Sequence, residues 1–232
     1  MIRLTKQLPD GVFCDVAAAK IYCNFAAYAN YENIALFWVQ QQDTKSTAVM
    51  CLIDGNFTLS TNGADIDELR DFIKVISPDT VFTDCVTAQK LGLNIKTECA
   101  VCVSEYPHTS GAAIENTNLG ITALYGIMKD FFPIDKQSFT ADISHRIRHN
   151  SCIYVTGNYS AAVMLLSARF AVVTGICVDA KKQLKGLGSA TLHRLLNSAR
   201  DRTVYACCDE DTLDFYLKNG FKRLENSAYC TL

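Results

Sequence analysis

Residues 178–189 read Val-Asp-Ala-Lys-Lys-Gln-Leu-Lys-Gly-Leu-Gly-Ser and connect an apolar run to an amphipathic pattern. The run 170–178 is rich in β-branched and apolar residues, which indicates a buried strand. After the stretch, apolar residues recur at helical spacing at Leu192, Leu195, Leu196 and Ala199. This spacing predicts a helix from Ser189, so Gly186 and Gly188 stand directly before N–H groups that lack intrahelical acceptors. Such a strand, loop and helix predict a binding site for a phosphate or pyrophosphate.

The loop matches neither of two common nucleotide motifs. The chain contains no G-x-x-x-x-G-K-[ST], and no G-x-G-x-x-G opens a βαβ unit near its N-terminus. The pattern present is Gln183-x-x-Gly186-x-Gly188, with Gln183 five residues after Val178. It resembles the pyrophosphate loop of the Gcn5-related N-acetyltransferase (GNAT) family, [Q/R]-x-x-G-x-[G/A]. Segment 213–221, Leu-Asp-Phe-Tyr-Leu-Lys-Asn-Gly-Phe, resembles the family's helix ending in Tyr-x-x-x-Gly-Phe. The resemblance covers residues 119–232.

The resemblance implies an α/β fold with a mixed, mostly antiparallel sheet and flanking helices, and acetyl-CoA as cosubstrate. Backbone groups of Ile176 and Val178 would hold the pantetheine arm, and N–H groups between Leu184 and Ser189 the pyrophosphate. The implied coenzyme-binding residues are Ile176, Val178, Gln183, Leu184, Lys185, Gly186, Leu187, Gly188 and Ser189. Leu184 stands where the family often has glycine. The alternative interpretation is an ordinary β–α turn that contains glycines.

Tyr216 lies four residues before Gly220, and by resemblance its phenol would protonate the departing coenzyme thiolate. The alternative is an amphipathic core tyrosine. A general base stays unassigned, because the strand 170–178 has no carboxylate. His145 and His149 lie one helical turn apart and are candidates, but a solvated helix face is the simpler interpretation.

The chain has the same predicted order of elements twice. The first series has strands 34–39, 46–53 and 56–60, helix 66–76, strand 80–83, helix 86–91 and strand 95–103. The second has strands 152–156, 161–167 and 170–178, a helix from 189, strand 203–207, helix 212–219 and a strand from 221. Residues 1–106 are therefore predicted to form a degenerate GNAT-like domain and 107–232 the acetyltransferase domain. The first copy has Thr61-Asn62-Gly63-Ala64 in place of the glycine loop and Ala88 in place of the tyrosine.

Three further segments are less informative. Residues 1–33 contain short apolar pieces that predict at most a short helix. Residues 105–118 have the composition of a linker. Apolar spacing predicts helices over 121–132 and 139–147, and the resemblance places substrate contacts within 119–149.

Composition limits the class of protein. The chain has 232 residues, 49% of them hydrophobic and 20% charged, with a net charge of -2, which is ordinary for a globular protein. No basic patch suggests nucleic acid or an anionic membrane, and no leader or membrane span is recognised, so a cytoplasmic location is expected. The eleven cysteines mostly lie in apolar runs and are interpreted as buried free thiols. Cys99-x-x-Cys102 lacks a second ligand pair, so no metal is expected.

These observations favour an acetyl-CoA-dependent N-acetyltransferase that moves an acetyl group directly to a primary amine of a small-molecule or peptide acceptor. One alternative is a non-catalytic, regulatory acyl-CoA-binding protein, and another is an enzyme using a different acyl-CoA. A homodimer is compatible with the sequence. The acceptor, the acyl length and the role of the first half do not follow from it.

Overall fold

The computed structural model describes residues 1–104, 119–131, 134–199 and 201–232. The first half contains β1 (Ile2–Leu4), α1 (Val16–Tyr28), β2 (Ala35–Gln42), β3 (Lys45–Ile53), β4 (Asn56–Thr61), α2 (Ile66–Ile76), β5 (Thr80–Asp84), α3 (Cys85–Leu91) and β6 (Asn94–Ser104). The second contains α4 (Ile121–Met128), α5 (Lys136–Arg148), β7 (Cys152–Thr156), β8 (Ser160–Leu166), β9 (Phe170–Val178), the 3₁₀ turn η1 (Ala180–Lys182), α6 (Leu187–Ser198), β10 (Thr203–Cys208), α7 (Glu210–Lys218), β11 (Lys222–Arg223) and β12 (Ser227–Thr231).

The described strands form one continuous sheet in the order β1-β2-β3-β4-β5-β12-β6-β10-β9-β8-β7, with β11 also paired to β6. Among these pairs, β4 with β5 and β9 with β10 are parallel, and the others are antiparallel. The hairpin between β3 and β4 turns at Asp54 and Gly55, which both have positive φ, as a tight two-residue turn requires. The predicted mixed, mostly antiparallel fold is confirmed.

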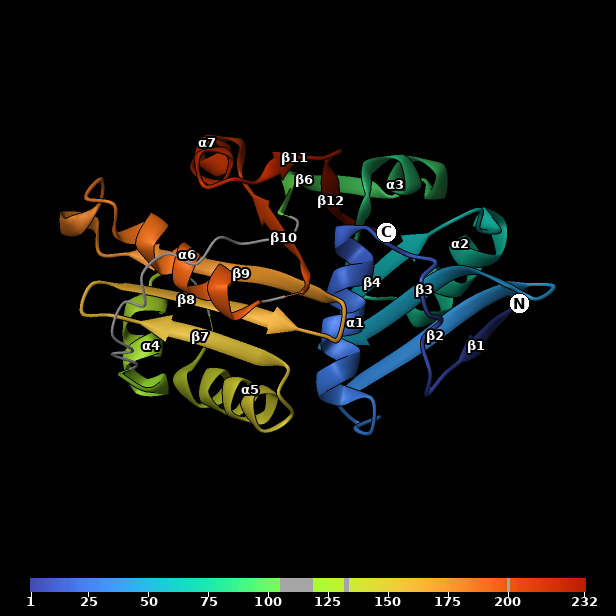
Figure 1. The fold of residues 1–232 in the computed structure, drawn as a ribbon. Helices are drawn as coiled ribbons and strands as arrows, with labels where there is room; N and C mark the ends of the chain where they lie inside the picture. Colours follow the sequence, from blue (N-terminus) through green and yellow to red (C-terminus); the bar gives the residue numbers. More distant parts are fainter. Residues whose placement is uncertain (105–118, 132–133, 200) are drawn as a thin grey trace.

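Helices cover both faces of this sheet (Figure 1). In the second half, α6 and α7 bury their apolar sides on one face of β8, β9 and β10. Helices α4 and α5 pack on the opposite face. In the first half, α2 and α3 cover the face equivalent to that of α6 and α7. Helix α1 stands between the halves and packs against strands of both (Figure 1).

The two halves exchange strands at the centre of the sheet. Strand β12, at the C-terminus, inserts between β5 and the first part of β6. The last part of β6, in turn, inserts between β10 and β11. Each half therefore completes its sheet with a strand from the other. Four strand pairs join residues on the two sides of the predicted division at residue 106. The predicted linker 105–118 lies outside the described residues, so the domain limits stay a prediction.

Several element limits differ from the sequence-based expectation. Helix α6 begins at Leu187 rather than Ser189, and the strand expected from residue 221 is divided into β11 and β12. Helix α1 is 13 residues long, because contacts with both halves stabilise a segment whose own periodicity is weak. None of the described helices is long and apolar enough to cross a membrane.

Candidate functional site

Strands β9 and β10 separate at their C-terminal ends. They pair in parallel only from Phe170 with Thr203 to Val173 with Ala206. Where they part, the pairing of β9 with β8 is interrupted by an irregularity that leaves Thr174 as an extra residue. A bulge of this kind bends a strand and interrupts its ladder. The C-terminal part of β9 is therefore turned away from β10, and no strand of the described residues pairs with its backbone on that side.

The loop after β9 is held by local hydrogen bonds. The Asp179 carboxylate accepts a bond of 2.8 Å from the N–H of Lys181. The Gln183 amide donates to the carbonyl oxygen of Val178 over 3.3 Å, which ties the loop back to the strand. Leu184 and Gly186 have φ values of 59° and 77°, and the Leu184 side chain is fully exposed.

Helix α6 begins at this loop without a capping side chain. Its first intrahelical bond runs from the N–H of Ala190 to the carbonyl of Gly186 over 3.0 Å. The N–H groups of Leu187, Gly188 and Ser189 consequently have no acceptor within the helix. Aspartate side chains cap four other helices: α1, α2, α3 and α5. The start of α6 thus keeps donors, and the positive end of the helix dipole, available for an anion.

The two glycines of the loop have different roles. A Cβ atom on Gly186 would have no heavy atom within 4 Å, so this residue borders open space. A Cβ atom on Gly188 would lie 3.2 Å from Cε2 of Phe215 and 3.6 Å from Cγ2 of Val178. Gly188 therefore permits close packing of α6 against α7 and β9. The sequence pattern assigned both glycines to the pyrophosphate and gave no sign of this packing.

Tyr216 is buried on α7 and lies in the same apolar cluster as Ile176 and Cys208. Its ring packs edge-on against Phe215 and Phe221, with centroids 5.2 and 5.3 Å away. Burial raises the pKa of the Tyr216 phenol, and the neighbouring Cys208 thiol adds to the shift. The hydroxyl group therefore stays protonated at neutral pH. The fold thus brings Tyr216 beside the opened end of β9, a position that suits a proton donor as well as a core residue.

The first half differs at the helix equivalent to α6. Helix α2 also follows the third strand of its series, but it is capped by Asp65, whose carboxylate accepts from the N–H of Glu68 over 3.1 Å. Asp67 and Glu68 add two further carboxylates to the first turn, whereas α6 has none there. The Asp65 carboxylate satisfies one of the free donors, and the three negative charges together would repel a pyrophosphate.

The first half also differs at the tyrosine. The N–H of Leu93 bonds to the carbonyl of Ala88 over 3.0 Å, as the N–H of Phe221 bonds to Tyr216 over 3.1 Å. Ala88 and Tyr216 thus occupy equivalent places, and the methyl side chain of Ala88 has no acidic group that could protonate a thiolate. Nearby, the hydroxyl groups of Thr61 and Thr87 bond to each other over 2.9 Å, which joins β4 to α3. The alanine in place of Tyr216 fits the interpretation of the first half as a degenerate copy, which stays a prediction.

The candidate bases His145 and His149 lie on the side of α5 that meets the C-terminal end of α1 and the segment after it. His145 stacks on Tyr28 with centroids 4.6 Å apart, and its Nε2 donates to the carbonyl of Ala27 over 2.9 Å. Nε2 of His149 is 3.2 Å from the Tyr31 hydroxyl. These contacts favour a packing role, and the general base remains unassigned.

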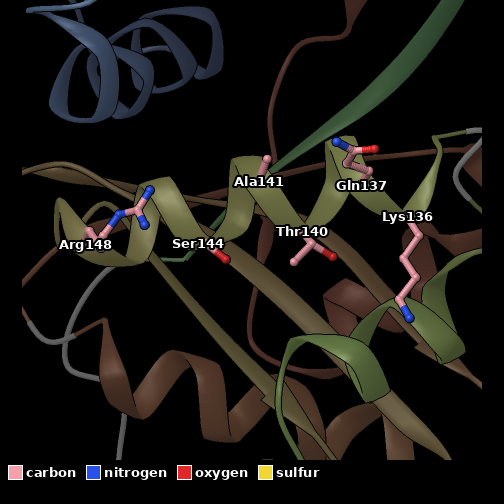
Figure 2. A pocket seen from close by; sticks show the side chains of 6 residues that line it. All are labelled: Lys136, Gln137, Thr140, Ala141, Ser144 and Arg148. Atoms are coloured by element: carbon pink, nitrogen blue, oxygen red, sulfur yellow. The ribbon is translucent and has the colours of Figure 1, made fainter.

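An open cavity of about 520 Å³ lies along another side of α5. Figure 2 shows that its labelled side chains all come from this one helix. They are Lys136, Gln137, Thr140, Ala141, Ser144 and Arg148. The cavity falls within the region 119–149 where acceptor contacts are predicted, but one helix side does not enclose a ligand. Among the described residues, no group of three His, Cys, Asp or Glu side chains is arranged to hold a metal ion.

Comparison with known proteins identifies the fold. No protein-family model and no curated protein sequence matches the chain. Solved structures do match. A GCN5-related N-acetyltransferase from Kribbella flavida has a TM-score of 0.59 and 12% identity, covering 93% of this chain and 95% of that one. A GNAT-family acetyltransferase from Colwellia psychrerythraea covers 100% of both chains with a TM-score of 0.54 and 10% identity.

A tandem GNAT protein from the clavulanic acid biosynthesis pathway matches over 92% of this chain and 93% of its own, with a TM-score of 0.53 and 9% identity. The chain therefore has the fold of the GNAT acetyltransferases, including a tandem one, which confirms the predicted resemblance. At these identities the likeness concerns the fold alone.

Proposed function

We propose that this protein is an acetyl-CoA-dependent N-acetyltransferase that binds its coenzyme in the second half and acetylates a primary amine. The observation that carries the proposal is the uncapped start of α6 directly beyond the opened end of β9. The start of α6 offers N–H donors to the pyrophosphate of the coenzyme, and the opened end of β9 offers backbone groups to its extended pantetheine arm. Lys181, Lys182 and Lys185 add positive charge to the same loop.

In the proposed complex, the N–H groups of Leu187, Gly188 and Ser189 hold the pyrophosphate. Backbone groups of Ile176 and Val178 hold the pantetheine arm, which brings the thioester to the place where β9 and β10 part. Gln183 keeps the loop closed through its bond to Val178. Positioning of this kind makes attack by a bound amine effectively intramolecular.

Acetyl transfer is proposed to be direct. The amine nitrogen attacks the thioester carbon, and backbone N–H groups at the bend of β9 stabilise the oxyanion. The C–S bond then breaks, the Tyr216 hydroxyl gives its proton to the leaving thiolate, and the amine loses its proton through water to solvent. The Tyr216 phenolate regains a proton from solvent after the thiol leaves. A buried phenol suits this step because it is protonated before the reaction.

A thiol-release assay with acetyl-CoA tests the proposal across amino acids, polyamines, aminoglycosides and peptide N-termini. At least one class of amine should be turned over. Tyr216→Phe keeps the ring packing and removes the proton donor, so turnover should fall on the order of 10²-fold while coenzyme binding changes little. Tyr154→Phe, a change on β7, is the matched control and should keep full activity.

The absence of a carboxylate along β9 (Phe170–Val178) favours a second candidate, a non-catalytic acyl-CoA-binding protein. Such a protein would bind coenzyme, release no thiol with any amine, and show no change in Tyr216→Phe beyond a small loss of stability. Full turnover in Tyr216→Phe would keep the enzyme and remove Tyr216 as the acid.

A further inference from the structure

On one face of the sheet, α1 packs beside the opening between β9 and β10, and α4 and α5 pack further along β8 and β9. On the other face, α6 and α7 pack against these strands, and Tyr216 lies among them. Cys207 is the first residue of β10 beyond its last pair with β9. It packs against the apolar cluster formed with α1 and is half-buried. Residues of α1 therefore lie beside the end of β10 where the two strands part.

The exchanged strands continue this face into the first half. Cys207 lies opposite Val101 of β6, and Cys99 faces the same side two residues earlier along β6. Beyond Cys99, Tyr229 of β12 lies between Thr97 of β6 and Phe82 of β5. The side chains of Tyr229 and Phe82 are in contact, with ring centroids 4.8 Å apart. The surface beside the opening is thus built partly by the first half.

Lys20 projects from α1 onto this surface. Its Nζ donates to the Tyr229 hydroxyl over 2.9 Å and lies 3.4 Å from the centroid of the Phe82 ring. Helix α1 also packs on the end of β10, because Ala19 and Cys23, on either side of Lys20 along the helix, share an apolar cluster with Tyr205 and Cys207. Lys20 therefore lies close to the opening as well as to the aromatic pair.

No carboxylate among the described residues forms an ion pair with Lys20. Aromatic faces attract an ammonium group but leave its charge in place. The Tyr229 side chain is 39% exposed, so a ligand from solvent can reach the hydroxyl and the ammonium together. A carboxylate would fit both, because each can donate a hydrogen bond to it.

We propose that Lys20 and Tyr229 bind a carboxylate on the acceptor, so that the preferred substrates are amines carrying a carboxylate, such as amino acids. This inference rests on the proposed acetyltransferase function. It gives the first half a role in the reaction of the second. Helix α1 of the first half, together with the exchanged strand β12, would supply the contact that selects the acceptor. The catalytic groups and the coenzyme site are unaffected by it.

The test compares amino acids with their amides, which keep the primary amine and lack the carboxylate. Wild type should have a kcat/KM for the acid on the order of 10- to 100-fold above that for the amide, as a charged hydrogen bond predicts. Lys20→Met should lower the value for the acid to that for the amide and leave the amide unchanged. Lys20→Arg should retain most of the preference, and Lys45→Met on β3 is the control.

A binding measurement separates this inference from the proposed function. Thermal shifts with free coenzyme A plus acid or amide report acceptor binding without turnover. A shift by the acid that Lys20→Met removes supports the carboxylate site even if no amine is acetylated. Equal use and equal binding of acid and amide by wild type would overturn the inference while leaving the acetyltransferase proposal standing. An equal fall for both in Lys20→Met would also overturn it, since that indicates a structural role.

Discussion

Ser189→Asp places a carboxylate among the N–H groups at the start of α6. A negative side chain in the first turn interacts favourably with the helix dipole, by about 0.3–1 kcal/mol. The free energy of unfolding without ligand should therefore stay the same or rise slightly. Coenzyme binding should instead become weaker, because the pyrophosphate of the coenzyme would lie at the same N–H donors as the added carboxylate. Two unit charges about 5 Å apart repel by about 3 kcal/mol at an effective dielectric constant near 20.

Half of that repulsion would raise the dissociation constant of the coenzyme about tenfold. At a coenzyme concentration of about 100 times the wild-type dissociation constant, the ligand stabilises the fold by about 2.7 kcal/mol, and a tenfold weaker complex by about 1.4 kcal/mol. Thermal unfolding with and without acetyl-CoA measures this difference. Ser189→Ala is the control, since it removes the hydroxyl without adding charge. Equal ligand-induced shifts in the two variants would refute the assignment of the pyrophosphate to the start of α6.

Three further predictions concern stability. Gly188→Ala should lower the melting temperature, because the added Cβ atom would lie 3.2 Å from Phe215; an unchanged melting temperature would contradict the packing role. Leu184→Gly removes a left-handed leucine, a conformation that costs about 1–2 kcal/mol, and adds the flexibility of glycine, which costs about 0.5–1 kcal/mol. Stability should therefore rise by about 0.5–1 kcal/mol with coenzyme binding kept; a loss of stability in denaturant unfolding would count against it. Burial raises the pKa of the Asp15 carboxyl in the folded state, so protonation of this group stabilises the fold. This contribution to the free energy of unfolding is complete below the unfolded-state pKa near 4, and it is lost as pH rises through the folded-state pKa. Asp15→Asn, which can still cap α1, should show a weaker dependence of the melting temperature on pH than wild type. The same pH dependence in both proteins would disprove this role of Asp15.

Local patterns predicted much of the fold. Helix α2 and strand β9 have the predicted limits, because a strong apolar period and clear end signals act within each segment. Helix α1 was predicted only in fragments. It is buried against strands of both halves, and a helix that is apolar on several sides lacks the one-sided period that identifies helices.

The exchange of β6 and β12 could not be read from the sequence. Their residues indicate strands, but the choice of partner depends on contacts between segments more than 120 residues apart, such as Cys99 with Ser227. Strand patterns fix which side chains face the core and leave the partner open. The bulge at Thr174 had one local signal, since a glycine at position 175 inside an apolar strand often marks such an irregularity.

The candidate site was predicted in part. The motif identified the loop, and the uncapped helix that follows it fits that prediction. The packing role of Gly188 depends on Phe215, which lies on another element, and the surface formed by Lys20 and Tyr229 depends on the exchanged strand. Neither relation exists within a short stretch of sequence.

The stoichiometry of coenzyme A binding, measured by isothermal titration calorimetry on the full chain, tests the central claim most directly. The uncapped start of α6 and the three carboxylates at the start of α2 predict one coenzyme per chain, bound in the second half and weakened in Ser189→Asp. Two coenzymes per chain would show that the first half also binds. No binding to the wild-type chain would contradict the account as a whole.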